Sequence, residues 1–136
     1  MALCWLDAGK RMQSKRILIV EDDADLRRMF RTILSMAGYD VEEAGDGVEA
    51  LRHVENRAPD LIVLDLVLRS LDGVSVQQEL AARALTRHIP IVIVTGSSID
   101  TGALDVACVL RKPVLPDDLV RTVKHCIARG GPASGA

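Results

Sequence analysis

Five charged or hydroxyl side chains in this sequence end or directly follow apolar runs: Glu21, Asp22, Asp65, Thr95 and Lys112. Any one of them taken alone is explained as a solvated strand end, but all of them together suggest a site. Two carboxylates about 5 Å apart repel by roughly 3 kcal/mol at an effective dielectric constant near 20, so an acidic cluster favours a bound cation. Oxygen ligands without His or Cys favour a hard ion, first Mg²⁺ and then Mn²⁺ or Ca²⁺.

A lysine and a threonine close to the same carboxylates would make this metal site suitable for phosphoryl chemistry as well. Phosphoryl transfer depends mostly on positioning and on charge stabilisation, which an ammonium, a hydroxyl and a metal ion provide together. In such a site Asp65 is either a metal ligand only or a nucleophile that forms an aspartyl phosphate. The residue types predict phosphoryl chemistry and leave these two roles of Asp65 open.

Four continuous apolar runs and one shorter segment predict the strands that must position these side chains. A run without polar residues is typical of a strand buried on both faces in a parallel sheet. By residue number the predicted strands are 17–20, 41–44, 60–65, 90–95 and 107–111.

Helical periodicity lies between the predicted strands. Residues 24–37 have apolar side chains at intervals of three and four, with Asp23 as the expected N-cap and Gly38 as the residue that closes the helix. The arginines between these apolar positions are expected to form a solvated face: Arg27, Arg28 and Arg31. Further helices are predicted over 48–56, over 74–85 and from Pro116 onward.

Strands that alternate with helices predict right-handed crossovers and a parallel sheet covered on both faces. We therefore expect an α/β fold in three layers, α/β/α, with a five-stranded parallel sheet in the flavodoxin-like order 2-1-3-4-5. That order places strands 1 and 3 side by side, at the point where open α/β sheets bind ligands. The expected organisation is a poorly ordered extension at 1–14, one domain at 15–129 and a flexible tail at 130–136.

The composition is that of a globular protein with no charge signature for nucleic acid. The chain has 136 residues, a hydrophobic fraction of 49% and a formal net charge of −2. No apolar run reaches the roughly 18 residues that span a bilayer, so we expect no membrane segment and a cytoplasmic location. The three cysteines lack metal-ligand spacing and are expected to be reduced: Cys4, Cys108 and Cys126.

Several motifs resemble the receiver domain of two-component response regulators, over about residues 16–129. The resemblance rests on the segments ILIVEDD at 17–23, AGYDV at 37–41, AGDGVEAL at 44–51, PDLIVLD at 59–65, Asp72-Gly73, Thr95-Gly96 and Lys112-Pro113. It implies that Asp65 accepts a phosphoryl group from the phosphohistidine of a histidine kinase, or from a small phosphodonor. The protein would then be a phosphoacceptor rather than an enzyme.

The resemblance also implies a role for each residue around Asp65. Asp22 and Asp65 would bind Mg²⁺ directly together with the backbone carbonyl of Val67, and Glu21 would act through water. On the phosphoryl side, the implied residues are Lys112, which pairs with the oxygens, Thr95, which donates a hydrogen bond, and Gly96, which leaves room for the group.

The implied partners are proteins. They are a sensor histidine kinase or phosphotransfer protein, a downstream target and, in some receivers, a second copy of the domain. Because the chain ends soon after the last predicted helix, we expect a stand-alone regulator that acts by protein contact, without direct contact to nucleic acid or membrane.

Three features depart from the family pattern. Val109 stands where the family usually has an aromatic residue, and Arg69 stands where a proline is usual. Only residues 96–111 separate Thr95 from Lys112, so the fourth helix of the pattern is expected to be shortened or missing. The output face that this helix usually helps to form would then be rebuilt.

Two alternatives belong to other functional classes. An aspartyl-phosphate phosphohydrolase of the haloacid dehalogenase type needs a second aspartate two residues after the nucleophile, and that position is Val67. A receiver-like interaction module without phosphorylation would be indicated by loss of an acidic residue, the threonine or the lysine. None of these is lost, so the phosphoacceptor is favoured.

Overall fold

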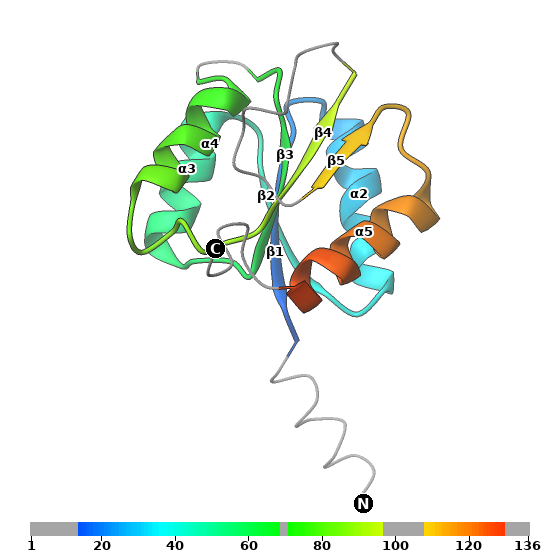
Figure 1. Ribbon diagram of the computed structural model, residues 1–136. Coiled ribbons are helices and arrows are strands. Elements are labelled where there is room, and N and C mark those ends of the chain that lie inside the picture. The colour runs from blue at the N-terminus through cyan, green and yellow to red at the C-terminus, as the bar shows by residue number, and fades with distance from the viewer. Residues whose placement is uncertain (1–13, 69–70, 97–107, 130–136) are drawn as a thin grey trace, which may run out of the picture.

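The computed structural model describes residues 14–68, 71–96 and 108–129. Within them, five parallel strands form one sheet in the order β2-β1-β3-β4-β5 (Figure 1). This order confirms the predicted topology, and each strand matches its predicted range to within one residue. The strands are β1 (Arg16–Val20), β2 (Asp40–Ala44), β3 (Leu61–Asp65), β4 (Ile91–Thr95) and β5 (Cys108–Arg111).

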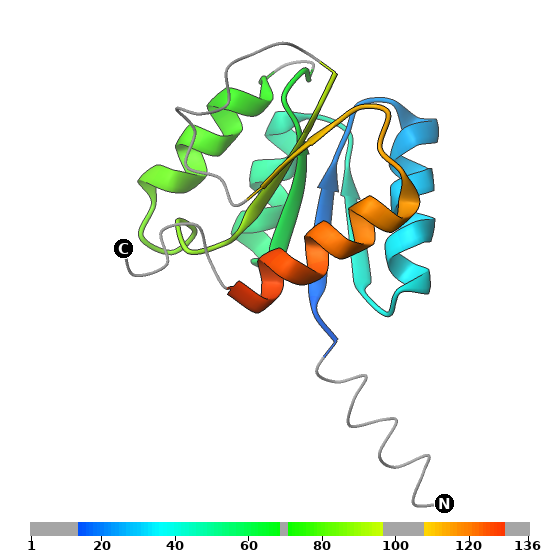
Figure 2. The ribbon, with the colours of Figure 1, turned by 45° about the vertical axis from the view of Figure 1, so that its right-hand side comes forward.

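Four helices among the described residues cover the two faces of the sheet, which confirms the three-layer architecture (Figures 1 and 2). They are α2 (Ala24–Met36), α3 (Gly47–Asn56), α4 (Gly73–Ala82) and α5 (Pro116–Arg129). Helices α2 and α5 bury Phe30, Leu34, Leu119 and Val123 against one face. Helices α3 and α4 bury Ala50, Val54, Val76 and Leu80 against the other.

The middle of the sheet is the most deeply buried part of the molecule. Every residue of β1, β3 and β4 is buried, as the apolar runs predicted. Burying one large aliphatic side chain contributes about 1.5–3 kcal/mol, so these strands form a stable platform for the polar residues at their carboxyl ends. The edge strands β2 and β5 are only partly buried.

Capping side chains set where the helices begin. Asp23 accepts hydrogen bonds from the backbone N–H groups of Asp25 and Leu26, so the predicted N-cap of α2 is confirmed. Gly38 has a φ of 100° just beyond the end of α2, as expected for a closing glycine. Asp72 caps α4 by accepting from Ser75 N–H at 2.7 Å.

Helix α4 is shorter than predicted. It ends at Ala82 rather than near residue 85, because the chain leaves the helix at Arg83 with extended backbone angles. The Thr86 hydroxyl then donates a 2.7 Å hydrogen bond to the Leu80 carbonyl, which satisfies an acceptor at the end of the helix. Apolar periodicity continues through this turn and could not mark its position.

The prediction of reduced cysteines is wrong for two of the three. Cys108 on β5 and Cys126 on α5 are joined as a disulfide. Both side chains belong to the apolar layer between the sheet and α5. Sequence spacing could not show that these two positions meet, because they lie on different elements.

Several predictions fall outside the described residues. These are the extension at 1–13 with Cys4, the loop residue Arg69, the segment 97–107 that was expected to hold the shortened helix, and the tail at 130–136. Among the described helices, none is long and apolar enough to cross a membrane.

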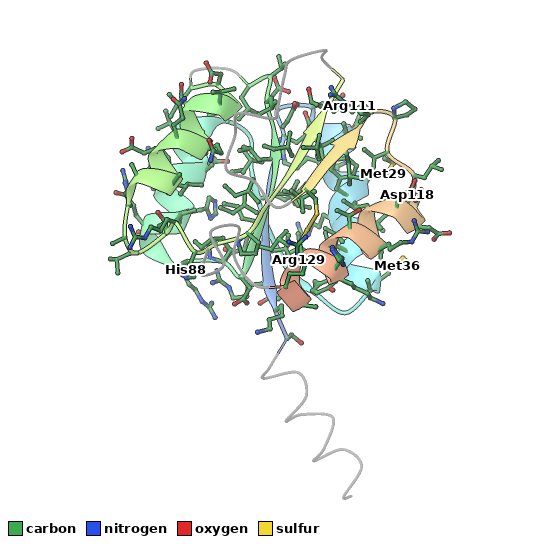
Figure 3. The ribbon with its side chains drawn as sticks, in the orientation of Figure 1. Met29, Met36, His88, Arg111, Asp118 and Arg129 are labelled. Atoms are coloured by element: carbon green, nitrogen blue, oxygen red, sulfur yellow. A yellow bond between two sulfur atoms is a disulfide. The ribbon has the colours of Figure 1, made fainter. Side chains whose placement is uncertain are left out.

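The outer faces of α2 and α5 carry exposed side chains. Met29 and Met36 on α2 are 44% and 84% exposed, and Asp118 and Arg129 lie toward opposite ends of α5 (Figure 3). These residues do not contribute to the buried core.

Candidate phosphoryl and metal site

A cleft of about 460 Å³ lies at the carboxyl ends of the strands. Its lining residues are Glu21, Asp22, Asp23, Asp65, Val67, Gly96 and Lys112. The sheet order explains this gathering, because β1 pairs with β3 and the register places Val20 opposite Leu64. The residues that follow, Glu21 and Asp65, therefore reach the same edge.

Three carboxylates meet in this cleft. Glu21, Asp22 and Asp65 each have an oxygen within 4.8 Å of the others. Glu21 is 1% exposed and Asp65 is 4% exposed, whereas Asp22 is partly exposed. The structure therefore brings these three residues together in one cleft.

Lys112 supplies the positive charge opposite the carboxylates. Its Nζ lies 3.2 Å from Asp65 Oδ2 and 3.1 Å from Glu21 Oε1. Burial lowers the pKa of Lys112, but its interactions with the carboxylates of Glu21 and Asp65 raise it by more, so the net shift is upward. The ammonium therefore stays charged at neutral pH and faces the acidic cluster.

Backbone N–H groups hold both the Asp65 carboxylate and the loop that follows it. The N–H of Val67 donates to Asp65 Oδ1 at 3.1 Å, so each carboxylate oxygen of Asp65 has its own partner. The N–H of Gly73 donates to the Leu66 carbonyl at 3.0 Å, which holds the start of α4 against this loop. The side chain of Val67 is 59% exposed at the mouth of the cleft.

Thr95 lies at the end of β4, where it was predicted, but it is not among the residues that line the cleft. It is fully buried, and its carbonyl accepts a 2.9 Å hydrogen bond from the Lys112 N–H. The strand end that carries Thr95 is thereby joined to the residue that carries the ammonium. A methyl group added at Gly96 would lie 3.7 Å from Lys112 Cβ, an ordinary contact.

Glu21 shows that the cleft suits a cation. Its Oε1 is buried and accepts no hydrogen bond, although the Lys112 Nζ lies 3.1 Å away as an ion-pair partner. Burial, with the neighbouring Asp65, raises the pKa of Glu21 from 4.5 to about 7, although the Asp23 N–H and Lys112 act in the opposite direction. An all-oxygen set that includes a buried carboxylate oxygen without a hydrogen bond fits a hard divalent ion such as Mg²⁺.

The raised pKa of Glu21 predicts a pH dependence in buffer that contains a chelator. Because the folded state favours the protonated carboxyl, the stabilisation is fully present below about pH 4.5 and is lost as the pH rises through about 7. The Glu21→Gln variant cannot ionise, so its stability relative to wild type should rise over this interval. Urea unfolding at several pH values measures the difference, and parallel profiles of the two proteins would contradict the prediction.

The close packing around Gly73 predicts that a side chain added there would destabilise the protein. A methyl group there would collide with the Asp65 carbonyl oxygen and would lie 2.5 Å from Leu66 Cα. Both are backbone atoms, which cannot move away by a change of rotamer. Gly73→Ala should therefore lower the free energy of unfolding by about 1–3 kcal/mol. Urea unfolding tests this, with Gly96→Ala as the control that should stay within about 0.5 kcal/mol of wild type.

The prediction of a solvated arginine face on α2 is wrong for Arg27. Its side chain is only 21% exposed and turns back toward β1 and β2. Its NH1 donates to the Glu21 carbonyl at 2.7 Å, and its Nε donates to Glu43 Oε1 at 2.9 Å. Alternation along β2 offered a signal, since Glu43 shares the α2 side of the strand with the partly buried Val41.

Comparison with known proteins decides the family. Residues 17–124 match the family model described as the response regulator receiver domain. The chain belongs to this receiver family. A solved receiver domain of a sensor histidine kinase from Pseudomonas aeruginosa PAO1, described with a magnesium ion in its active-site cleft, is 28% identical. Its alignment covers 85% of our chain and 98% of that chain, with a TM-score of 0.79.

Curated relatives of this receiver are longer regulators. Response regulator MprA of Mycobacterium sp. (strain KMS) is 37% identical over 128 residues, which cover 88% of our chain and 54% of the relative. The phosphate regulon transcriptional regulatory protein PhoB of Pseudomonas aeruginosa is 36% identical, with 89% and 55% covered. The chain spans about half the length of the curated relatives it matches. These names do not support the prediction of a stand-alone protein without nucleic-acid contact, which stays a prediction.

Proposed function

We propose that this receiver accepts a phosphoryl group on Asp65 from the phosphohistidine of a histidine kinase or phosphotransfer protein, or from a small phosphodonor. The observation that carries the proposal is the meeting of three carboxylates and the Lys112 ammonium in one cleft. A carboxylate oxygen of Asp65 would attack phosphorus as the bond from phosphorus to the donor nitrogen breaks, and the leaving imidazole would take up a proton. The protein is then a phosphoacceptor, not an enzyme for other substrates.

The proposed metal is Mg²⁺, held by Asp22, Asp65 and the Val67 carbonyl, with Glu21 acting through water. When bound, the ion would offset negative charge on the phosphoryl oxygens. Lys112 would contribute the second positive charge from its place beside Asp65. The Val67 N–H would keep Asp65 Oδ1 in place during the transfer.

Thr95 is proposed to donate a hydrogen bond to a phosphoryl oxygen, which requires its hydroxyl to turn toward the cleft. The phosphorylated receiver is proposed to signal in the cytoplasm by contact with a downstream protein. A second proposed contact is the pairing of two copies of the receiver. Measuring the size of the protein in solution before and after phosphorylation would detect it.

Metal removal tests the proposal. The protein is incubated with acetyl phosphate in MgCl₂, and intact mass spectrometry follows the gain of one phosphoryl group. We expect incorporation that survives mild acid, is reversed in base, and is abolished by a chelator or by prior heat denaturation. No incorporation by the native protein, or equal incorporation after chelation, would contradict the proposal.

A further inference from the structure

Arg27 connects the end of β1 to the edge strand β2. Its guanidinium donates through NH1 to the Glu21 carbonyl at 2.7 Å and through Nε to Glu43 Oε1 at 2.9 Å. Both the Arg27 and the Glu43 side chains are about three-quarters buried, at 21% and 24% exposure. The two bonds are therefore partly sheltered from competing water.

A second arginine of α2 contacts the other carboxylate oxygen of Glu43. Arg31 NH1 donates to Glu43 Oε2 at 2.7 Å from a side chain that is 56% exposed. Burial raises the pKa of Glu43, but the two arginines lower it by more, so the net shift is downward. Glu43 thus remains an anion that anchors Arg27, while Arg31 touches only the far oxygen of that anion in the described contacts.

The main chain of Glu21 is held on both sides, by Ala44 at the end of β2 and by Arg27 on α2. Its N–H donates to the Ala44 carbonyl at 3.1 Å, and its carbonyl accepts from Arg27. This carbonyl belongs to the planar peptide unit that joins Glu21 to Asp22, so its orientation sets the direction of both residues. The Glu21 carboxylate also accepts from the Asp23 N–H at 3.2 Å.

We infer that Arg27 is a positioning residue for the acidic pair Glu21 and Asp22. The inference rests on the proposed function, in that these carboxylates bind a divalent ion. Arg27 acts on the peptide between them and is not itself a ligand. A guanidinium suits this role because its donors form a rigid fork that reaches two acceptors at once, whereas an ammonium is a single point charge.

Metal affinity gives the first test. Mg²⁺ binding to the full chain is measured by titration calorimetry for wild type, Arg27→Met, Arg27→Lys and the matched control Arg31→Met. Loss of a group that orients metal ligands typically weakens metal binding roughly 10- to 100-fold, which we expect for Arg27→Met. Arg27→Lys should fall between Arg27→Met and wild type, and Arg31→Met should bind as wild type does.

Amide hydrogen exchange in metal-free protein gives the second test. In Arg27→Met the Asp23 N–H should exchange faster, because the Glu21 carboxylate that accepts its hydrogen bond is no longer aligned. General destabilisation would instead speed exchange throughout β1 and β2. Arg31→Met should leave the Asp23 exchange rate unchanged.

The outcomes separate the inference from the proposed function. Absence of Mg²⁺ binding by wild type would defeat the proposed metal site, while the exchange measurement would still decide whether Arg27 orients this loop. Wild-type Mg²⁺ affinity in Arg27→Met, or an unchanged Asp23 exchange rate, would overturn the inference. If Arg27→Met does not fold, both measurements are made on Arg27→Lys. Wild-type values of Mg²⁺ affinity and of the Asp23 exchange rate in Arg27→Lys would then overturn the inference.

Discussion

The Asp65→Asn variant is expected to lose phosphoryl incorporation completely, from a kinase phosphohistidine and from acetyl phosphate alike. Asparagine has nearly the same shape, so its side-chain oxygen can still accept the hydrogen bond from the Val67 N–H. Its carboxamide lacks the anionic oxygen that attacks phosphorus and the charge that attracts a cation. Intact mass spectrometry after incubation with each donor measures the loss, and circular dichroism shows whether the variant is folded.

Asp117→Asn is the matched control. Asp117 is an exposed carboxylate in the first turn of α5, outside the residues that line the cleft. This variant should incorporate phosphoryl groups at the wild-type rate. A folded Asp65→Asn protein that is labelled as well as wild type would show that the acceptor is another residue.

The second large effect is expected for Lys112→Met. The Lys112 ammonium lies within 3.2 Å of Asp65 Oδ2 and is the cation of the cleft among the described residues that line it. Removing one fixed group that stabilises developing charge typically costs about 10²- to 10³-fold in rate, so we expect phosphorylation about a hundredfold slower. The initial rate with acetyl phosphate at saturating Mg²⁺ measures it.

Mg²⁺ affinity separates this effect from simple damage to the site. Loss of a positive charge next to the carboxylates should not weaken cation binding, because the ammonium and the metal ion compete for the same oxygens. Lys124→Met, which removes an exposed lysine of α5, is the control and should leave both quantities unchanged. Phosphorylation of Lys112→Met at the wild-type rate would show that the ammonium does not take part.

Much of the fold follows from short-range patterns in the sequence. In β1, β3 and β4 both faces are buried, so the apolar residues run on without interruption and mark each strand almost to the residue. Alternation of strands and helices then restricts the topology to a few arrangements, of which the observed order is one. The acidic cluster follows in turn, because parallel strands must end at one edge.

Contacts between distant elements were harder to predict. Helical periodicity separates an apolar from a polar side, but it does not say which arginine of α2 turns back to reach β2. Arg27 does so because Glu43 faces the same layer and the Glu21 carbonyl needs a donor. The pairing of Cys108 with Cys126 is similar, since it depends on how α5 crosses β5.

The most direct test of the central claim is to locate the phosphoryl group itself. Phosphorylated protein is reduced with borohydride, which converts an aspartyl phosphate to a stable alcohol, and the changed residue is identified by peptide mass spectrometry. We predict that the change lies at Asp65. A change at another carboxylate, or a phosphoryl group carried by His53, His88 or His125, would contradict the account.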